Sequence, residues 1–388
     1  MLHKYENKFD RLPLLEKLVE EINENIFESV YILACQHVLP SVHLMIRSMV
    51  DLGLSKDNVA VIGKCYSTSQ LAMTNMNKEG IYVCKTSSMF DSHKTFDHQF
   101  IENIDKFIDF QMHRMSLSKD KKIIIIDDGG ELITAFKQKF PNFTNVFAIE
   151  QTTAGYNKLK PLELNFPVVN IARSHTKLEL EPQMIAKSIL KVLLNNISSL
   201  NLNISNALII GNGAIGNALG QQLKNLYNIT MYDKKAYKSE INKTQLKLNE
   251  FDLIIGSTGT NVLNQNDYKL LKHNTILASA SSSDREFNAL YLRKFKDQTT
   301  NCHEIVNSNN IYLLNSGFPL NFIGSDYDSV PVEKIQLIIG LMFYATVQFL
   351  LNPKEYKNGL VKPSFSTQKK ILNLFFNSFN ASKFCKAA

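Results

Sequence analysis

Cysteine is scarce in this sequence, and its few copies form no recognisable motif. The 388 residues include 5 cysteines, an odd number, and no two of them are spaced as a C-x-x-C pair. A framework of paired disulfides is therefore not expected, and reduced thiols in a cytoplasmic protein fit best. No metal site is predicted.

Long uninterrupted apolar runs and clusters of like charge are missing as well. The N-terminal stretch Met1–Glu20 is charged and has no apolar core of signal-peptide length. The longest apolar stretch, Ile335–Leu351, is interrupted by Gln336 and Gln348, which favours a buried helix over a membrane span. The net charge of +7 comes from lysines scattered among asparagine and acidic residues. We therefore expect neither a membrane nor a nucleic acid as a partner.

Short apolar runs alternate with helix-like segments through the first half of the sequence. Two of the helix-like segments are Ser41–Leu52 and Leu132–Phe140. Continuous apolar strands separated by helices are typical of a parallel sheet that is covered on both faces. The strand-like runs are Val30–Ala34, Val59–Ile62, Ile81–Cys84, Ile123–Ile126, Val146–Ile149 and Pro167–Ile171.

A glycine-rich turn near the middle of the sequence is the strongest single motif. The apolar run Ala207–Ile210 leads into Gly211-Asn212-Gly213-Ala214-Ile215-Gly216, and a helix follows. In a G-x-G-x-x-G fingerprint the first glycine allows the tight turn, the second admits a pyrophosphate, and the third lets helix pack on strand. Asp233 ends the next apolar run, where a carboxylate can bind the ribose hydroxyls. The motif predicts a bound dinucleotide, with NAD preferred, although Lys234 and Lys235 leave NADP open. The alternative is a purely structural glycine turn.

The late position of this turn predicts two domains. The amphipathic stretch Glu181–Ser198, with Pro182 in its first turn, is the expected connecting helix. The apolar helix Val332–Leu351 is expected to return to the first domain. The fold class is therefore α/β, with two Rossmann-like doubly wound domains and a C-terminal helical return segment. The predicted boundaries are 1–182 for the substrate domain, completed by 330–352, then 183–329 for the NAD-binding domain and 353–388 for the C-terminal segment.

Four polar clusters follow strands of the predicted first sheet. Open α/β sheets bind their ligands at the carboxyl ends of their strands, so four clusters at one edge indicate a cleft. Taken singly, each cluster has a structural explanation as a turn or a buried histidine. The clusters are Cys35-Gln36-His37, Asp127-Asp128-Gly129-Gly130-Glu131, Glu150-Gln151-Thr152-Thr153-Ala154-Gly155 and Arg173-Ser174-His175-Thr176-Lys177.

In their order along the sequence, these clusters resemble the motifs of the S-adenosylhomocysteine hydrolase family. That family carries a histidine after its first strand, then D-D-G-G-D-L-T, S-E-E-T-T-T-G and N-D-S-x-T-K-x-x-x-D-N segments, a central G-x-G-x-x-G, and a late L-A-E-G-R-L-x-N-L segment. Tyr66-Ser67-Thr68 is similar to its F-S-T, and Leu314–Phe322 is similar to the late segment. The resemblance spans roughly residues 10 to 350, and no single motif is intact.

The resemblance implies an enzyme that holds NAD tightly and uses it for transient oxidation of a ribose 3′-hydroxyl. Loss of the C4′ proton then expels a 5′-thiol, water adds, and the hydride returns. By position, Lys177 would assist 3′-deprotonation, Asp128 and His37 would move protons at C4′ and C5′, and Glu181 would take the place of a sugar-binding aspartate. The implied substrate-binding residues are Thr68, Glu150, Gln151, Ser282 and Asn321. The implied cofactor-binding residues are Thr152, Thr153, Gly211, Gly213, Ala214, Ile215, Gly216, Asp233, Ser257, Thr258, Gly259 and Asn321.

Departures from the family pattern concentrate at the base and amino-acid ends of the implied substrate. Leu39 and Ser41 occupy positions where the family contacts adenine, and Ser282 occupies the position of a histidine. Losing buried polar partners usually signals a changed ligand. The remaining departures are Gln151 for a glutamate, Arg173 for an aspartate, Pro182 for an asparagine, an unrecognisable G-H-P-S-F segment around Ser325–Pro331, and the missing K-P-x-x-Y-R-Y arm in Phe379–Ala388.

Three functions remain open on this basis. The first is an enzyme with the same internal redox chemistry on an altered nucleoside or sugar substrate, which we favour. The second is a genuine S-adenosylhomocysteine hydrolase, and the third is an NAD-binding regulatory paralogue with little activity. The C-terminal arm is missing, while an apolar terminal segment is still present, so a homodimer is expected in place of the family's tetramer. The apolar residues of that segment are Ile371, Leu372, Leu374, Phe375, Phe376 and Phe379.

Overall fold

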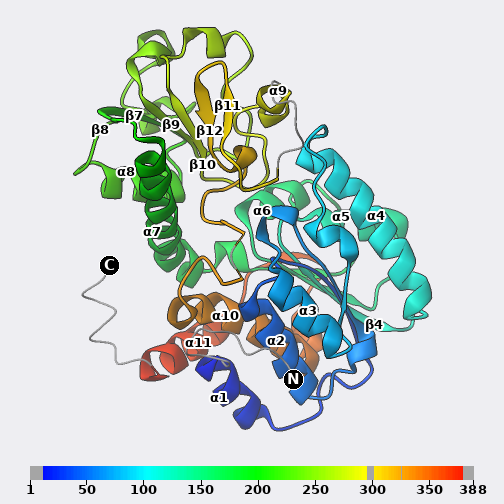
Figure 1. Cartoon of the computed structure of the whole chain (residues 1–388). Coiled ribbons are helices and arrows are strands. Elements are labelled where there is room, and N and C mark those ends of the chain that lie inside the picture. The colour runs from blue at the N-terminus through cyan, green and yellow to red at the C-terminus, as the bar shows by residue number, and fades with distance from the viewer. Residues whose placement is uncertain (1–11, 295–300, 325, 379–388) are drawn as a thin grey trace. The chain divides into compact units, whose positions relative to one another are not determined.

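The computed structural model describes residues 12–294, 301–324 and 326–378, which divide into two compact units. Unit 1 comprises residues 12–89, 101–179 and 326–378. Unit 2 comprises residues 90–100 and the described residues between 180 and 324. The protein is an α/β protein with two Rossmann-like units, each built on its own sheet (Figure 1).

Unit 1 contains a seven-stranded sheet with the order β13-β6-β5-β4-β1-β2-β3, in which every pairing is parallel. The strand order reverses between β1 and β4, because the polypeptide builds outward from β1 in one direction and from β4 in the other. In doubly wound sheets that reversal leaves a crevice at the carboxyl ends of the two strands. The strands are β1 (Val30–Cys35), β2 (Val59–Ile62), β3 (Tyr82–Val83), β4 (Lys122–Asp127), β5 (Val146–Glu150), β6 (Pro167–Asn170) and β13 (Gly359–Val361).

The central strands of unit 1 are buried on both faces, as their continuous apolar composition predicts. Ile123, Ile124, Ile125 and Ile126 of β4 are all fully buried. Ring stacking adds to this core, with Phe147 of β5 and Phe349 of α10 at a centroid distance of 3.9 Å. The helices that lie in unit 1 are α1 (Pro13–Ile22), α2 (Pro40–Asp51), α3 (Gln70–Lys78), α5 (Glu131–Lys139), α6 (Thr153–Leu159), α10 (Val332–Leu351) and α11 (Phe365–Ser378), together with most of α4 (Phe96–Arg114).

The helix α10 is long and apolar enough to cross a membrane by length and composition, but 67% of its apolar window is buried within the structure. It contacts α1, α2, α11 and β5, all in unit 1. Gln336 is fully buried and accepts a hydrogen bond from the backbone N–H of Leu14 at 3.1 Å. The interrupting glutamine thus serves as a polar contact inside a core helix.

Unit 2 contains a six-stranded sheet with the order β11-β12-β10-β9-β7-β8, parallel except for the β11–β12 pair. The order reverses between β7 and β9, which places the ends of these two strands at the crevice of this sheet. The strands are β7 (Asn206–Ile210), β8 (Asn228–Tyr232), β9 (Leu253–Gly256), β10 (Ile276–Ser279), β11 (Val306–Ser308) and β12 (Ile311–Leu313), and the helices include α8 (Ala214–Leu223) and α9 (Ala289–Arg293).

The connecting helix differs from its prediction. We expected it to begin at Glu181 with Pro182 in the first turn, but α7 runs from His175 to Leu200 with Pro182 inside it. An internal proline lacks the N–H that would bond the carbonyl of residue 178. Ser174 marks the start instead, because its hydroxyl accepts from the backbone N–H of Lys177 at 3.2 Å. The proline misled the prediction because proline is most common in a first turn.

Candidate functional site

Asp128 is the centre of a polar cluster in the crevice of unit 1. It follows β4 directly, and its side chain is buried beside residues that follow β1, β2 and β5. The Lys64 ammonium donates to Oδ1, and the Gln151 amide donates to Oδ2. The Nε2 atom of His37 lies 3.4 Å from the same Oδ2. The strand order therefore brings together three predicted site residues and one that was not predicted, Lys64.

His37 is held from both sides of its ring. Its Nδ1 atom is hydrogen-bonded to the Ser67 hydroxyl at 2.5 Å, while Nε2 faces Asp128. A proton on Nε2 would point at the carboxylate, and Nδ1 would then accept from Ser67. The ring retains a side-chain exposure of 20%, so it remains accessible to a ligand. The arrangement suits an imidazole that exchanges a proton while its orientation stays fixed.

The charges of the cluster are set by burial and by ion pairing. Burial alone would raise the pKa of Asp128, but the Lys64 ammonium and His37 hold it well below its usual range. Burial alone would lower the pKa of Lys64, but Asp128 raises it well above its ordinary value. Both groups are therefore charged at neutral pH. A carboxylate of such low pKa is a poor proton acceptor, so it acts as a fixed negative charge beside His37.

Two further carboxyl groups near the cluster, those of Asp127 and Glu150, have raised pKa values, in contrast to Asp128. Burial and the neighbouring Glu131 raise the pKa of Asp127 to about 7, although its Oδ2 accepts from the backbone N–H of Ile133 at 2.9 Å. Burial and the charge of Asp127 also raise the pKa of Glu150 well above its usual value. The Oε1 atom of Glu150 accepts from Gly129 N at 3.2 Å and from the backbone N and hydroxyl of Thr152, each at 2.6 Å. Glu150 therefore fixes the two turns that carry the site.

The variant Asp127→Asn should be more stable than the wild type above about pH 7. The folded-state pKa of Asp127 lies above its unfolded value of about 3.9. Its contribution to stability is therefore complete below that unfolded value and is lost as the pH rises through the folded value. Between the unfolded and the folded pKa of Asp127, the free energy of unfolding falls by about 1.4 kcal/mol per pH unit. The asparagine keeps an acceptor for Ile133 without the charge.

Chemical denaturation of Asp127→Asn at about pH 5 and about pH 8 measures this effect. The exposed Asp120→Asn variant serves as the control, because its charge change is not coupled to this burial. An equal difference from the wild type at both pH values would contradict the assignment.

The other predicted residues of unit 1 lie near the turns of the same sheet edge. Thr68 donates its hydroxyl to the carbonyl of Lys64 at 3.0 Å, which shapes the turn after β2. The Thr152 hydroxyl accepts from Gly155 N at 2.9 Å and so caps α6, in which Thr153 is the first residue. Lys177 lies half-buried in the first turn of α7. Of the predicted catalytic and substrate-binding residues, three belong to unit 2 and not to the unit that carries the Asp128 cluster: Glu181, Ser282 and Asn321.

The glycine turn of unit 2 has the geometry of a cradle for a dinucleotide. Gly211 has φ +106°, and a Cβ there would lie 2.6 Å from the carbonyl oxygen of Ser257. A Cβ on Gly216 would lie 1.9 Å from the carbonyl oxygen of Gly211, whereas a Cβ on Gly213 would meet nothing within 4 Å. Gly213 also caps α8 without a side-chain bond to its first N–H groups. Packing therefore requires glycine at Gly211 and Gly216. Gly213, the second glycine of the fingerprint, borders open space, as a pyrophosphate site requires.

Asp233 supports the same interpretation. Its Oδ2 accepts from Asn212 N at 2.8 Å and its Oδ1 from Lys235 N at 2.9 Å. Burial would raise the pKa of Asp233, but these backbone N–H groups hold it below its usual value. An ionised carboxylate that keeps spare lone pairs beside the glycine turn suits ribose hydroxyls. The residues present therefore fit NAD.

A residue that the sequence prediction missed organises the turn after β9. Glu286 is buried, and its carboxylate accepts from Thr258 N at 2.6 Å and Gly259 N at 2.5 Å. Ser281 also donates to it, at 2.5 Å. Glu286 therefore fixes the predicted cofactor turn Ser257–Gly259 in the way that Glu150 fixes the turns of unit 1. It follows no strand directly, so the strand-end argument could not find it.

Ser41, at a position where polar contacts to the base were expected, is already bonded to another segment of unit 1. Its backbone N–H donates to Asp328 Oδ2 at 3.0 Å, and its hydroxyl donates to Oδ1 at 2.5 Å. Asp326 similarly accepts from the Ser69 hydroxyl at 2.8 Å. Burial raises the pKa of Asp328 to about 6. Asp326 and Asp328, in the segment that matched no family motif, thus supply carboxylates to the N-termini of α2 and α3, while Ser325 lies outside the described residues.

No protein-family model matches the chain, but several curated proteins are similar to it in sequence, among them the following three. The uncharacterized protein Rv0104 of Mycobacterium tuberculosis is 34% identical over 342 residues, covering 86% of this chain and 68% of that protein. S-inosyl-L-homocysteine hydrolase of Methanothermobacter thermautotrophicus is 22% identical over 353 residues, covering 84% and 79%. Adenosylhomocysteinase of Acinetobacter baylyi is 25% identical over 236 residues, covering 51% and 50%.

Some solved structures are similar to this chain in fold. The NAD-bound 3-phosphoglycerate dehydrogenase of Entamoeba histolytica covers 86% of this chain and all of its own length, with 10% identity and a TM-score of 0.40. This likeness concerns the fold alone.

Proposed function

We propose that this chain, which belongs to the same family as the Mycobacterium tuberculosis protein Rv0104, is an NAD-dependent hydrolase of purine nucleoside 5′-thioethers. The observation that carries the proposal is the Asp128 cluster at the strand-order reversal of unit 1, in a protein whose other sheet carries a dinucleotide cradle. Distant similarity to S-inosyl-L-homocysteine hydrolase and to adenosylhomocysteinase supports it.

The proposed reaction consumes water and no external oxidant. Bound NAD would accept the hydride from C3′ of the ribose and return it at the end of the cycle. In between, the 3′-ketone acidifies the C4′ proton, its removal expels the thiolate from C5′, and water adds across the resulting double bond. The sum is a thioether plus water giving a nucleoside and a thiol.

The cluster geometry favours His37 as the group that moves protons. Asp128 stays ionised because Lys64 lies against it, so it stabilises the protonated imidazole and fixes its orientation. Gln151 donates to the same carboxylate, a contact that the family's glutamate at this position could make only when protonated. We assign Lys177, in the first turn of α7, to deprotonation of the 3′-hydroxyl.

The substrate that fits this protein best is S-inosyl-L-homocysteine. At the adenine-side positions Leu39 is buried and apolar, and the Ser41 hydroxyl is bonded to Asp328. Neither offers the free polar contact expected for adenine. The relative that acts on the inosyl compound aligns over 84% of this chain, against 51% for the adenosyl enzyme. Hydrolysis of S-adenosyl-L-homocysteine is the second candidate, and an NAD-binding regulatory protein is the third.

Assembly as a homodimer is part of the proposal. Ile371 and Phe375 of α11 are buried, but Phe365 is 80% exposed and Phe376 is 37% exposed on the same helix. Exposed aromatic side chains on one helix suit a contact with a second copy. Phe379, which was expected to contribute, lies outside the described residues.

Lys177→Ala should suppress the first redox step of the proposed reaction. With NAD-loaded wild type, addition of substrate should produce a transient absorbance near ~340 nm, the signature of reduced cofactor. Removing the proton acceptor should lower the rate of that signal by about 10²–10⁴-fold. Lys187→Ala, on the exposed side of the same helix, is the matched control and should retain the signal. An unchanged signal in Lys177→Ala would show that another group accepts the proton.

A further inference from the structure

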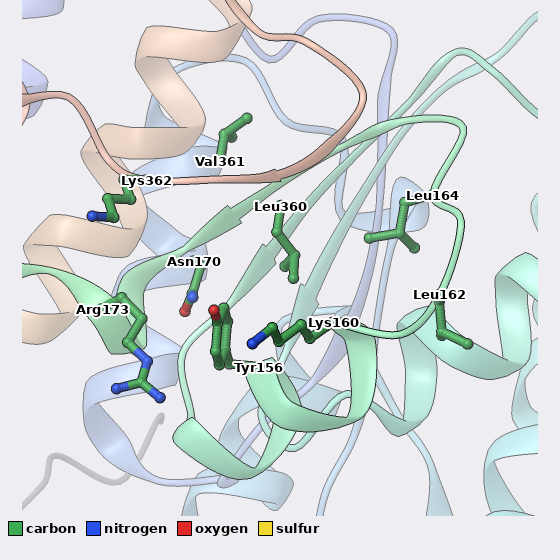
Figure 2. A pocket seen from close by; sticks show the side chains of 9 residues that line it. All are labelled: Tyr156, Lys160, Leu162, Leu164, Asn170, Arg173, Leu360, Val361 and Lys362. Atoms are coloured by element: carbon green, nitrogen blue, oxygen red, sulfur yellow. The ribbon is translucent and has the colours of Figure 1, made fainter.

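A pocket in unit 1 shares no lining residue with the Asp128 cluster. It has a volume of about 320 Å³ and lies beside α6, the end of β6 and β13 (Figure 2). Small-molecule sites usually begin at about 300 Å³, so the volume suffices for a small organic molecule. The lining residues are Tyr156, Lys160, Leu162, Leu164, Asn170, Arg173, Leu360, Val361 and Lys362.

Every ionisable group of the lining other than Tyr156 is cationic. Lys160, Arg173 and Lys362 contribute three positive charges, and no aspartate or glutamate lines the pocket. Among the described residues, none of the three forms an ion pair. Arg173 stands where the adenosylhomocysteine hydrolases carry an aspartate, so the charge at this position is reversed. The uncompensated cations predict an anionic occupant.

The guanidinium of Arg173 is positioned by an aromatic ring and, among the described residues, not by a carboxylate. Its guanidinium carbon lies 4.6 Å from the centroid of the Tyr156 ring, a cation–π contact. Stacking on an aromatic face leaves the edge of the guanidinium free to bind a carboxylate or phosphate with two parallel hydrogen bonds. The Lys160 side chain extends toward the same ring in Figure 2.

Asn170 supplies an independent indication of a ligand. It is only 2% exposed, and its side-chain oxygen is buried without a hydrogen-bond partner. Figure 2 shows its amide end pointing toward the space between Arg173 and Tyr156. An unpaired buried amide costs free energy unless a ligand satisfies it. Since amide oxygen and nitrogen exchange places by rotation, it can serve a ligand donor or acceptor.

The rest of the lining is apolar. Leu162, Leu164, Leu360 and Val361 form a surface that a charged headgroup alone would not cover. We propose that this pocket binds a small amphipathic anion, with a carboxylate or phosphate group held by Arg173 and Lys160 and an apolar body against the leucines. This site is additional to the proposed nucleoside site, and neither depends on the other.

Fluorescence titration with 8-anilinonaphthalene-1-sulfonate, an apolar anion, tests this proposal. We expect saturable one-to-one binding, weakened at least tenfold in an Arg173→Gln/Lys160→Gln double variant. Lys78→Gln, at an exposed lysine of α3, should bind as the wild type does. The neutral N-phenyl-1-naphthylamine should not distinguish the variants. Competition by benzoate and by phenyl phosphate at constant ionic strength then identifies the preferred headgroup.

Equal affinity in the double variant and in Lys78→Gln would overturn the proposal, and so would the absence of saturable binding. Thermal unfolding of each variant verifies that the fold is retained. Thiol release from a nucleoside thioether reports separately on the Asp128 site, so failure of one proposal is distinguishable from failure of the other.

Discussion

Replacing Lys64 by methionine should lower kcat/KM by about 10²–10⁴-fold, the range expected when positioned acid–base chemistry is lost. Lys64 is 3% exposed, and its ammonium neutralises the buried Asp128 carboxylate. Methionine has a similar length but no charge, so Asp128 would be left as an uncompensated buried anion. Removing one partner of such a pair typically costs about 3–5 kcal/mol of stability.

Lys64→Met should also change how stability and activity depend on pH. The depressed pKa of Asp128 contributes stability above its unfolded value of about 3.9, and that contribution is lost as the pH falls through the folded value. Without Lys64, burial dominates and the pKa of Asp128 rises. The acid limb of activity should therefore move to higher pH in Lys64→Met, whereas the stability of this variant should increase as the pH falls, because protonation removes the uncompensated buried charge.

A second variant separates folding from chemistry. Lys64→Met/Asp128→Asn removes both charges, so it should recover most of the lost stability and remain inactive. Lys78→Met, at an exposed lysine, is the control for the substitution itself. Wild-type activity in Lys64→Met would show that the ion pair has no role in the reaction.

Gly213→Val should weaken NAD binding at least about 100-fold, equivalent to about 2.7 kcal/mol, without unfolding the protein. A Cβ at Gly213 meets no atom within 4 Å, so the added side chain occupies only the space intended for the pyrophosphate. Isothermal titration with NAD measures the affinity. Thermal unfolding without the cofactor should match the wild type.

Gly216→Ala provides the contrasting case. Its Cβ would lie 1.9 Å from the carbonyl oxygen of Gly211, so even a methyl group forces strand and helix apart. This variant should lose stability before any ligand is added. If Gly213→Val bound NAD as tightly as the wild type, the turn would be structural and the cofactor proposal would fail.

Much of the fold was predictable because it shows in local sequence, both in the spacing of apolar residues and in the residues that directly follow a strand. The four isoleucines of β4 and the G-x-G-x-x-G turn after β7 each specified a buried strand and its continuation. Strands β13 (Gly359–Val361) and β11 (Val306–Ser308) escaped prediction because neither carries a run of more than two apolar residues. Their pairing is decided by tertiary contact with β6 and β12.

The residues of the Asp128 cluster that were predicted from the sequence all closely follow a predicted strand. His37, Asp128 and Gln151 follow β1, β4 and β5, and the strand order brings them together. Lys64 follows β2 after a single glycine, so the same rule could have found it. Asp328 could not have been found, because its contact with Ser41 joins positions 287 residues apart.

The central claim is tested most directly by measuring thiol release and cofactor state together. Purified NAD-loaded protein is mixed with S-inosyl-L-homocysteine or with S-adenosyl-L-homocysteine, and free thiol and absorbance near ~340 nm are followed over many turnovers. The account predicts continuous thiol release from the inosyl compound, at least about tenfold faster than from the adenosyl compound, a preference worth about 1.4 kcal/mol. The absorbance should rise and return, with no net reduction of NAD. Accumulation of reduced cofactor without thiol, or the absence of both signals with either compound, would contradict it.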